Sequence, residues 1–257
     1  MEFFDTHAHL DQPEFDADRA EVVARAREAG VREMVAIGTT AATSAVCVRL
    51  AAEYEGVYAA VGMQPNYISE AADGDWDRVV ALVGERGVVA IGETGLDRHW
   101  DFTPFDVQQD YFDRHLRLAQ QRKLPFVVHM RDCDDDILAM LREAHARGPL
   151  RGVMHSFTGS LAMAEECLAM GLAISFAGME TYKKSDALRA VAAAVPADRI
   201  LIETDSPYLS PEPVRKMKRN EPANVVHTAA RLAEVRGEAI EVFAAQSTAN
   251  ARALFIR

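Results

Sequence analysis

The feature that most constrains the fold is a regular alternation of short apolar runs with longer helical patterns. The apolar runs are rich in Val, Ile and Phe and are too short for helices, which suits strands that are buried on both faces of a parallel sheet. There are eight of them, at residues 3–10, 33–38, 57–62, 88–92, 126–129, 152–155, 172–176 and 200–203.

Amphipathic segments rich in Ala and Leu separate or follow these runs, as helices would. Clear examples cover residues 106–122, 134–147, 161–170, 186–194, 223–236 and 240–255. Gly237 lies between the last two and predicts a helix end. Strands that alternate with helices predict a parallel sheet, and 257 residues is a typical length for a (β/α)₈ TIM barrel. We therefore predict one α/β barrel domain over residues 1–257, with a doubly wound open sheet as the alternative.

Composition narrows the class of protein. No run of about 18 apolar residues occurs, so no membrane-spanning helix or membrane partner is expected. The first residues lack the pattern of an export signal. The three cysteines, Cys47, Cys133 and Cys167, are scattered and odd in number, which favours a reducing, cytoplasmic compartment. A monomer is favoured.

The net charge of −11 argues against broad affinity for duplex nucleic acid, because the phosphates require a positive surface. This charge does not exclude a nuclease. Bound divalent ions would add positive charge within the site itself and outweigh a distant acidic surface.

Metal-binding residue types fall at the carboxyl ends of the predicted strands. His7 and His9 are two residues apart on the first strand, so their side chains point to the same face. Four more follow or end later strands, namely Glu93, His129, His155 and Asp205. Such strand ends converge on the active-site face of a barrel. A lone histidine there is usually structural, but the joint pattern predicts a site for zinc, manganese, magnesium, nickel or a similar ion.

Seven short motifs carry these residues and cover nearly the whole chain. They are residues 5–10 (DTHAHL), 92–97 (GETGLD), 125–131 (PFVVHMR), 155–159 (HSFTG), 203–209 (ETDSPYL), 219–222 (RNEP) and 250–255 (NARALF). In this order they resemble the TatD family of metal-dependent deoxyribonucleases, a branch of the amidohydrolase-like barrels.

The resemblance implies two divalent ions with separate ligand groups. The first ion would be held by His7, His9 and Asp205, and the second by His129 and His155. Glu93 would bridge them, since residues 88–98 contain no lysine that could be carboxylated as in related barrels. Glu203 fits a partner for a histidine better than a ligand.

One position departs from the family pattern. The family usually carries G-x-H-P after the third strand, whereas residues 62–65 read GMQP, so Gln64 stands where a histidine is expected near the substrate phosphate. Glutamine can donate a hydrogen bond but cannot carry a proton's charge at neutral pH.

Two further groups are candidates for substrate binding. Arg215, Lys216, Lys218 and Arg219 form a basic cluster after the last strand, which suits a phosphate backbone or is simply a solvated loop. The aromatic residues Trp100, Phe157 and Tyr208 follow predicted strands and suit base stacking or ordinary packing.

The leading functional hypothesis is hydrolysis of a phosphodiester by two-metal activation of water, on DNA and preferably single-stranded DNA. Asp205 would accept the proton of the water, and Glu93 would hold the two ions. The alternative is hydrolysis of a carboxylic ester or amide, as in a D-aminoacyl-tRNA deacylase. A barrel that only binds a ligand would be expected to have lost some of these metal-binding residues, and all six are present.

Overall fold

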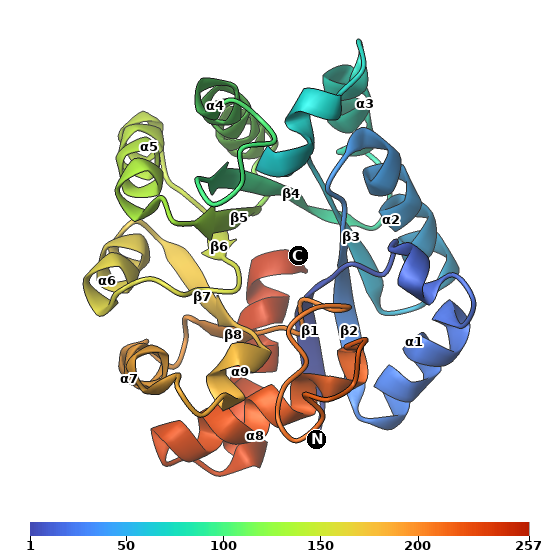
Figure 1. Ribbon diagram of the computed structural model, residues 1–257, viewed down its shortest axis with the longest axis vertical. Helices are drawn as coiled ribbons and strands as arrows, with labels where there is room; N and C mark the ends of the chain where they lie inside the picture. Colours follow the sequence, from blue (N-terminus) through green and yellow to red (C-terminus); the bar gives the residue numbers. More distant parts are fainter. Residues whose placement is uncertain (257) are drawn as a thin grey trace.

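The computed structural model describes residues 1–256, and its centre is an eight-stranded parallel sheet (Figure 1). Each strand pairs with the next one along the chain, in the order β1 to β8. The strands are β1 (Phe3–Ala8), β2 (Val31–Ile37), β3 (Val57–Val61), β4 (Val88–Asp97), β5 (Phe126–Arg131), β6 (Gly152–Met154), β7 (Leu172–Phe176) and β8 (Ile200–Ile202).

The sheet closes on itself between β1 and the segment after β8. Ala8 forms a parallel bridge with Ser206, and the backbone N–H of His9 donates to the Ser206 carbonyl at 2.8 Å. The N–H of Asp205 donates to the His7 carbonyl at 2.9 Å. This closure confirms the predicted barrel over the open doubly wound sheet, in which the strand order would reverse.

Helices surround the strands on the outside of the barrel (Figure 1). They are α1 (Arg19–Glu28), α2 (Ala41–Glu53), α3 (Asp75–Leu82), α4 (Phe105–Arg122), α5 (Asp134–Arg147), α6 (Leu161–Ala169), α7 (Asp186–Ala194), α8 (Val225–Arg236) and α9 (Ile240–Phe255). Short 3₁₀ helices are η1 (Pro13–Phe15), η2 (Pro65–Glu70), η3 (Gly178–Thr181) and η4 (Pro222–Asn224). Gly237 ends α8 in the left-handed conformation, as predicted.

Two strands run further than the sequence predicts. β4 continues to Asp97 and β5 to Arg131, so Glu93 lies within β4 rather than after it, and His129 lies within β5 rather than at its end. The extension depends on Gly95, which pairs with His129 and where a Cβ would lie only 1.9 Å from the His129 carbonyl oxygen. The ladder therefore continues beneath the site and holds the two side chains on a rigid base.

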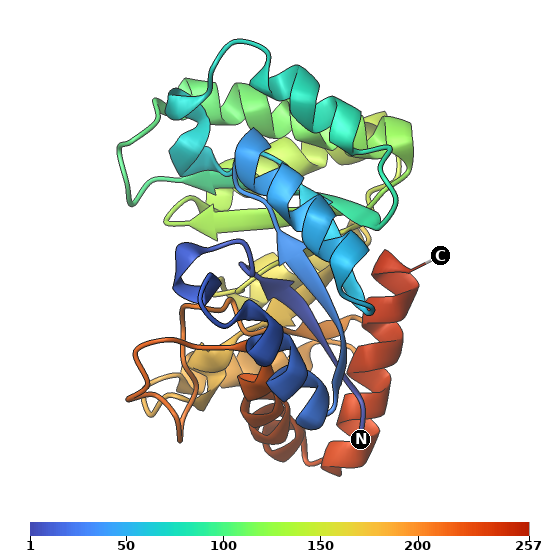
Figure 2. The ribbon, with the colours of Figure 1, turned by 90° about the vertical axis from the view of Figure 1, so that its right-hand side faces the viewer.

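The apolar core has two layers. The larger layer lies between the strands and the surrounding helices, and it includes Phe112, Phe126 and Phe176. The smaller layer fills the inside of the barrel near the amino ends of the strands, where α9 packs against it (Figure 2). Its members are Phe4, Val35, Ile37, Ala60, Val89, Ala90, Val127, Val153, Ala173, Leu201, Ala251 and Phe255.

Among residues 1–256, no helix has the length and apolar character needed to cross a membrane.

Candidate metal centre

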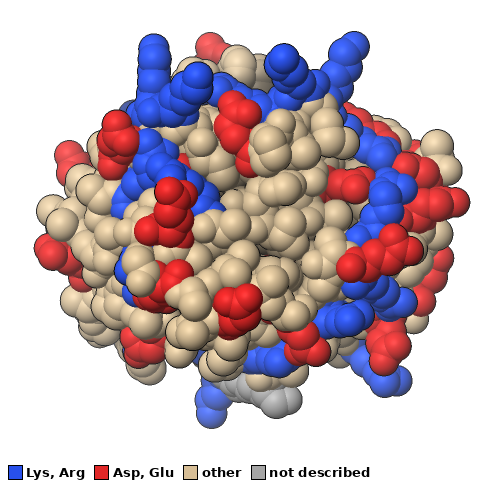
Figure 3. All heavy atoms as spheres, turned by 90° about the horizontal axis from the view of Figure 1, so that it is seen from below, with Lys and Arg blue, Asp and Glu red and all other residues tan. Residues whose placement is uncertain are grey.

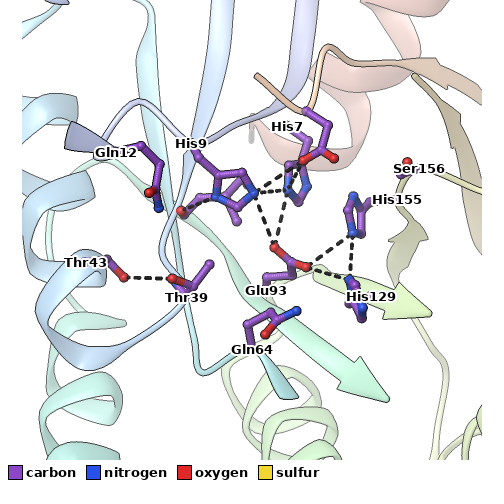
Figure 4. Close-up of polar contacts among 12 residues, drawn as sticks. His7, His9, Gln12, Thr39, Thr43, Gln64, Glu93, His129, His155 and Ser156 are labelled. Carbon is purple, nitrogen blue, oxygen red and sulfur yellow. Dashed lines mark hydrogen bonds and ion pairs between the residues drawn. The ribbon is translucent and has the colours of Figure 1, made fainter. Parts of the chain in front are cut away.

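The six predicted ligands lie together at the carboxyl end of the barrel. Figure 4 shows Glu93 between two pairs of histidines, with His7 and His9 on one side and His129 and His155 on the other. They come from β1, β4, β5 and the ends of β6 and β8, so the closing of the barrel brings together residues that are about 200 positions apart in sequence.

Each carboxylate oxygen of Glu93 faces one pair of histidines. Its Oε1 lies 2.9 Å from His129 Nδ1 and 3.3 Å from His155 Nε2. Its Oε2 lies 3.4 Å from His7 Nε2 and 3.6 Å from His9 Nε2. A carboxylate in this position has one oxygen available for each of two cations.

Asp205 completes the group around His7 and His9. Its Oδ1 lies 3.6 Å from His7 Nε2 and 3.3 Å from His9 Nε2, and the two Nε2 atoms are 3.2 Å apart. Tetrahedral ligands at about 2.0–2.1 Å from zinc lie about 3.4 Å from one another. The separations around this group therefore fit a small divalent cation at its centre.

Two buried carboxylates contact the outer nitrogens of the second histidine pair. Glu203 Oε1 lies 3.2 Å from His155 Nδ1, and Asp97 Oδ2 lies 3.1 Å from His129 Nε2. Such contacts fix the tautomer and the ring plane of a ligating histidine. Glu203 thus takes the supporting place expected from the sequence, whereas the role of Asp97 was not anticipated.

The first histidine pair is oriented differently. His9 Nδ1 lies 3.2 Å from the Ile37 carbonyl oxygen, which holds its ring in place. His7 Nδ1 is buried without a hydrogen-bond partner among the described residues, and its ring stacks on His155 with 4.0 Å between centroids. Stacking thus places the His7 ring against the second pair, while its Nδ1 stays unpaired among the described residues.

Contacts between the acidic and histidine side chains of the cluster shift their pKa values. Burial raises the pKa of the Glu93 carboxyl, but the His155 charge and contacts with the histidines outweigh burial and hold this pKa well below its usual value. Burial lowers the pKa of His9, but contact with Asp205 and the charge of Glu93 outweigh it and raise the pKa to about 9. A bound cation would replace these imidazole protons, because histidine ligates a metal in its neutral form.

A cavity of about 610 Å³ opens above these ligands. Four of the residues that line it, Asp132, Ser156, Asp205 and Leu209, have left-handed backbone with φ between 42° and 57°. Non-glycine residues adopt this conformation at a cost of about 1–3 kcal/mol, and such strain concentrates at functional sites. These turns were not visible in the sequence, because none of the four is glycine.

Gln64 lines the same cavity and is buried. Its side-chain Oε1 accepts a hydrogen bond from the Asn66 backbone N–H at 2.8 Å, which begins the 3₁₀ helix η2. The Nε2 group is then left to donate toward the cavity. On the other side of this corner, the neutral His115 accepts the Met63 N–H at 3.0 Å, and burial lowers its pKa to about 4.

The basic cluster lies outside the cavity lining. Arg219 donates to Asp18 at 2.6 Å and so ties the loop after β8 to the start of α1. Arg215 lies over the Tyr182 ring at 3.9 Å, while Lys216 and Lys218 are exposed. Figure 3 shows acidic and basic side chains interspersed on the face drawn there, with no continuous basic surface on that face.

The three aromatic candidates divide between cavity and core. Trp100 and Tyr208 line the cavity and are about half exposed. Phe157 was a wrong candidate for stacking, because its ring is buried against Phe176 in the layer between strands and helices.

Comparison with known proteins agrees with this geometry. The profile of the family described as TatD related DNase matches residues 4–256. The chain is 39% identical over 252 residues to YabD of Bacillus subtilis, described as an uncharacterized metal-dependent hydrolase, with 98% of each chain covered. It is 38% identical over 256 residues to the 3'-5' ssDNA/RNA exonuclease TatD of Klebsiella pneumoniae, covering 98% of this chain and 97% of that protein.

The fold comparison gives the same result. The crystal structure of YJJV, a TatD homolog from Escherichia coli K12, matches with a TM-score of 0.92 and 32% identity, covering 98% of this chain and 97% of that one. These matches extend over the whole barrel, including every strand that carries a candidate ligand, and the chain therefore belongs to the TatD-related DNase family.

Proposed function

We propose that this protein is a metal-dependent phosphodiesterase that cleaves single-stranded nucleic acid, preferably DNA, with two divalent ions. The observation that carries the proposal is the position of Glu93, whose two oxygens face separate pairs of histidines at 2.9–3.6 Å. The names of the TatD relatives, which describe exonucleases on ssDNA and RNA, support the choice of substrate.

The ligand groups divide as the family resemblance implies. His7, His9 and Asp205 would hold the first ion, and His129 and His155 the second, with Glu93 shared between them. Divalent ions in such a site lower the pKa of water and offset charge on phosphate oxygens. Zinc, manganese, magnesium and nickel all suit a set of imidazole and carboxylate donors.

Asp205 is the proposed proton acceptor. Both acidic ligands line the cavity, and the Asp205 side chain is the more exposed, at 14% against 4% for Glu93. Asp205 is therefore the acidic ligand that is more accessible to solvent and substrate. It would take the proton of the attacking water while Glu93 remains between the histidine pairs.

Substrate binding is assigned to groups around the mouth of the site. Gln64 Nε2 would donate a hydrogen bond to a phosphate oxygen or to the leaving oxygen. Lys216 and Lys218 would attract a longer strand from outside the cavity, with Arg215 beside them. Arg219 would act mainly by anchoring this loop, since Asp18 already occupies its guanidinium group.

We further infer that the chain works as one monomeric barrel domain in the cytoplasm. The cysteines are free and buried, which suits a reducing compartment. Three of the exposed large hydrophobic side chains line the cavity, which accounts for their exposure without an interface between subunits.

Gln64 also supports a second candidate function, hydrolysis of a carboxylic ester or amide such as an aminoacyl-tRNA. Acyl transfer requires a hydrogen-bond donor for the developing oxyanion, and an amide N–H can serve. The same water and the same proton acceptor would then act on a carbonyl carbon.

An activity panel separates the two candidates. Purified protein is stripped of metal, supplied in turn with Mg²⁺, Mn²⁺, Ni²⁺ and Zn²⁺, and assayed on a single-stranded oligonucleotide, its duplex and a D-aminoacyl ester. The proposal predicts metal-dependent cleavage in the order single strand, duplex, ester. Turnover of the ester alone would replace it with the acyl hydrolase, and Glu93→Gln serves as the inactive control.

A further inference from the structure

Three exposed aromatic side chains line the metal-site cavity, namely Tyr67, Trp100 and Tyr208. Of the eight large hydrophobic residues that are exposed in the described chain, six lie on segments that follow β3, β4, β6 or β8. These six are Tyr67, Trp100, Phe102, Leu161, Tyr208 and Met217. A sugar–phosphate backbone alone gives no reason for three exposed aromatic rings in the cavity lining, so these rings indicate a substrate that also presents apolar faces.

Trp100, one of these lining residues, is paired with Phe102. Their rings stack with 5.2 Å between centroids and 9° between planes, although they are 44% and 59% exposed. Trp100 lines the cavity, and Phe102 supports it from the neighbouring position. An exposed pair of parallel rings offers a flat surface of the kind on which a nucleobase stacks.

A cation lies beside this pair. The Arg131 guanidinium carbon is 5.8 Å from the centroid of the Trp100 ring, and Arg131 itself is exposed and lines the cavity. Within residues 1–256 it forms no ion pair with a carboxylate, in contrast to Arg98, which is bound to Asp136 at 2.8 Å. Arg131 is thus available to an anionic ligand at the position where an aromatic surface is also available.

Asp97 holds this surface at a fixed place relative to the metal ligands. Its Oδ1 accepts the backbone N–H groups of His99 at 2.8 Å and Trp100 at 3.1 Å. Its Oδ2 lies 3.1 Å from His129 Nε2. One buried carboxylate therefore positions both a predicted metal ligand and the start of the loop that carries the two rings.

We propose that Trp100, supported by Phe102, stacks an unpaired nucleobase next to the cleaved phosphodiester, and that Arg131 contacts the adjoining phosphate. This inference rests on the proposed nuclease function and adds the origin of strand selectivity. In a duplex both faces of an internal base are already stacked on neighbouring bases, so only a single strand can occupy this subsite.

Kinetics on two matched substrates test the stacking. One is a short oligothymidylate, and the other is a chain of the same length with abasic sugars. Trp100→Ala should raise KM on the oligothymidylate about 5- to 150-fold, the range expected for one base–aromatic stack, and change KM on the abasic chain less than about twofold. Trp100→Phe should retain most of the affinity, and Val242→Ala, an exposed apolar residue of α9, should leave both substrates unaffected.

The role of Arg131 is tested separately, by the salt dependence of binding. Arg131→Gln should weaken binding of both chains and reduce the slope of log affinity against log salt by about 0.7, the value for one contact with a single-stranded phosphate. Arg49→Gln, an exposed arginine on α2 that is outside the cavity lining, is the matched control. An unchanged slope would remove Arg131 from the subsite.

A binding measurement keeps the test independent of catalysis. The chain has two tryptophans, so Trp76→Phe leaves Trp100 as the single reporter. Its fluorescence should be quenched by oligothymidylate and not by the abasic chain. Equal quenching by both, or equal loss of activity on both substrates in Trp100→Ala, would overturn the stacking. If wild-type protein cleaves neither chain, the nuclease proposal fails, while the quenching result still decides whether the subsite binds a base.

Discussion

The two ends of this barrel are built from the same eight strands but differ in what they bury. At the amino end, Phe4 and Phe255 pack against each other and α9 covers the opening (Figure 2). At the carboxyl end, Glu93 and His155 are equally buried, but they are charged groups that face one another. Apolar burial stabilises by about 25 cal/mol per Å², whereas buried charges carry a desolvation cost.

The residues that stabilise the fold thus lie at the amino ends of the strands, and the candidate metal ligands lie at the carboxyl ends. The amino end has an apolar core that contributes to the free energy of folding, and none of the six candidate metal ligands lies there. The carboxyl end contains left-handed turns and closely spaced acidic and histidine side chains at the candidate metal site. Substitutions at one end should therefore affect one property and leave the other nearly unchanged.

The largest effect is expected for Glu93→Gln. The amide keeps the size of the side chain but cannot supply a charged oxygen to each histidine pair, so turnover should fall at least about 10³-fold. The circular dichroism spectrum and the unfolding transition of the metal-free protein should remain those of a folded barrel. Turnover within tenfold of wild type would show that the site lies elsewhere.

Phe255→Ala tests the opposite end. Removing a buried phenyl group from the amino-end core should lower the free energy of unfolding by about 3–5 kcal/mol, measured by urea denaturation. The activity per folded molecule should stay within about twofold of wild type. Val242→Ala on the exposed side of the same helix should change neither quantity, and a large loss of activity in Phe255→Ala would mean that the two ends are coupled.

Added metal should increase the free energy of unfolding by binding only to the candidate ligands at the carboxyl end of the barrel. At a concentration of about 100 times its Kd, a divalent ion should add about 2.7 kcal/mol to the free energy of unfolding. Wild type and Phe255→Ala should gain the same amount, because distant sites contribute additively. Glu93→Gln should gain clearly less. A full gain in this variant would contradict the ligand assignment.

The smallest effect is expected for Gln64→His. The neutral imidazole can accept the Asn66 N–H through one nitrogen and donate from the other. On protonation it gives up that acceptor contact and becomes a charged donor toward the cavity, which is a stronger donor than the amide. Cleavage of single-stranded DNA should rise by up to about tenfold and should fall again as the pH is raised and the imidazole deprotonates. If cleavage falls and ester turnover rises instead, the acyl hydrolase becomes the better proposal.

The hydrophobic periodicity and the residues at the ends of each segment are enough to predict the first and last residues of several helices and strands. The predicted bounds of β7, α5, α7 and α9 are those observed, because each begins and ends at a clear change of hydrophobic pattern. The ends of β4 and β5 were missed. Their extension depends on close backbone approach at Gly95, which is a property of register and leaves no trace in hydropathy.

The candidate ligands could be named from the sequence because barrel topology fixes where strand ends meet. Residues whose role depends on a distant partner could not be placed in this way. Asp97 supports His129 only because the β4–β5 register brings them together. The basic cluster predicts that Arg219 contacts substrate, and the structure adds an ion pair with Asp18, 201 residues earlier, that the local sequence does not indicate. Such pairings are decided by three-dimensional proximity that no local pattern contains.

The position of α9 has a consequence for how the barrel assembles. This helix comes after all eight strands, yet it covers the core that begins with Phe4, and its Thr248 donates to the Glu2 carbonyl across 246 residues of chain. Contacts of such sequence separation form late in folding, because their loop-closure entropy must first be overcome. Intermediates that contain the strands but lack a docked α9 would expose an apolar surface at one end of the barrel. Transiently exposed apolar surface of this kind makes folding intermediates prone to aggregate.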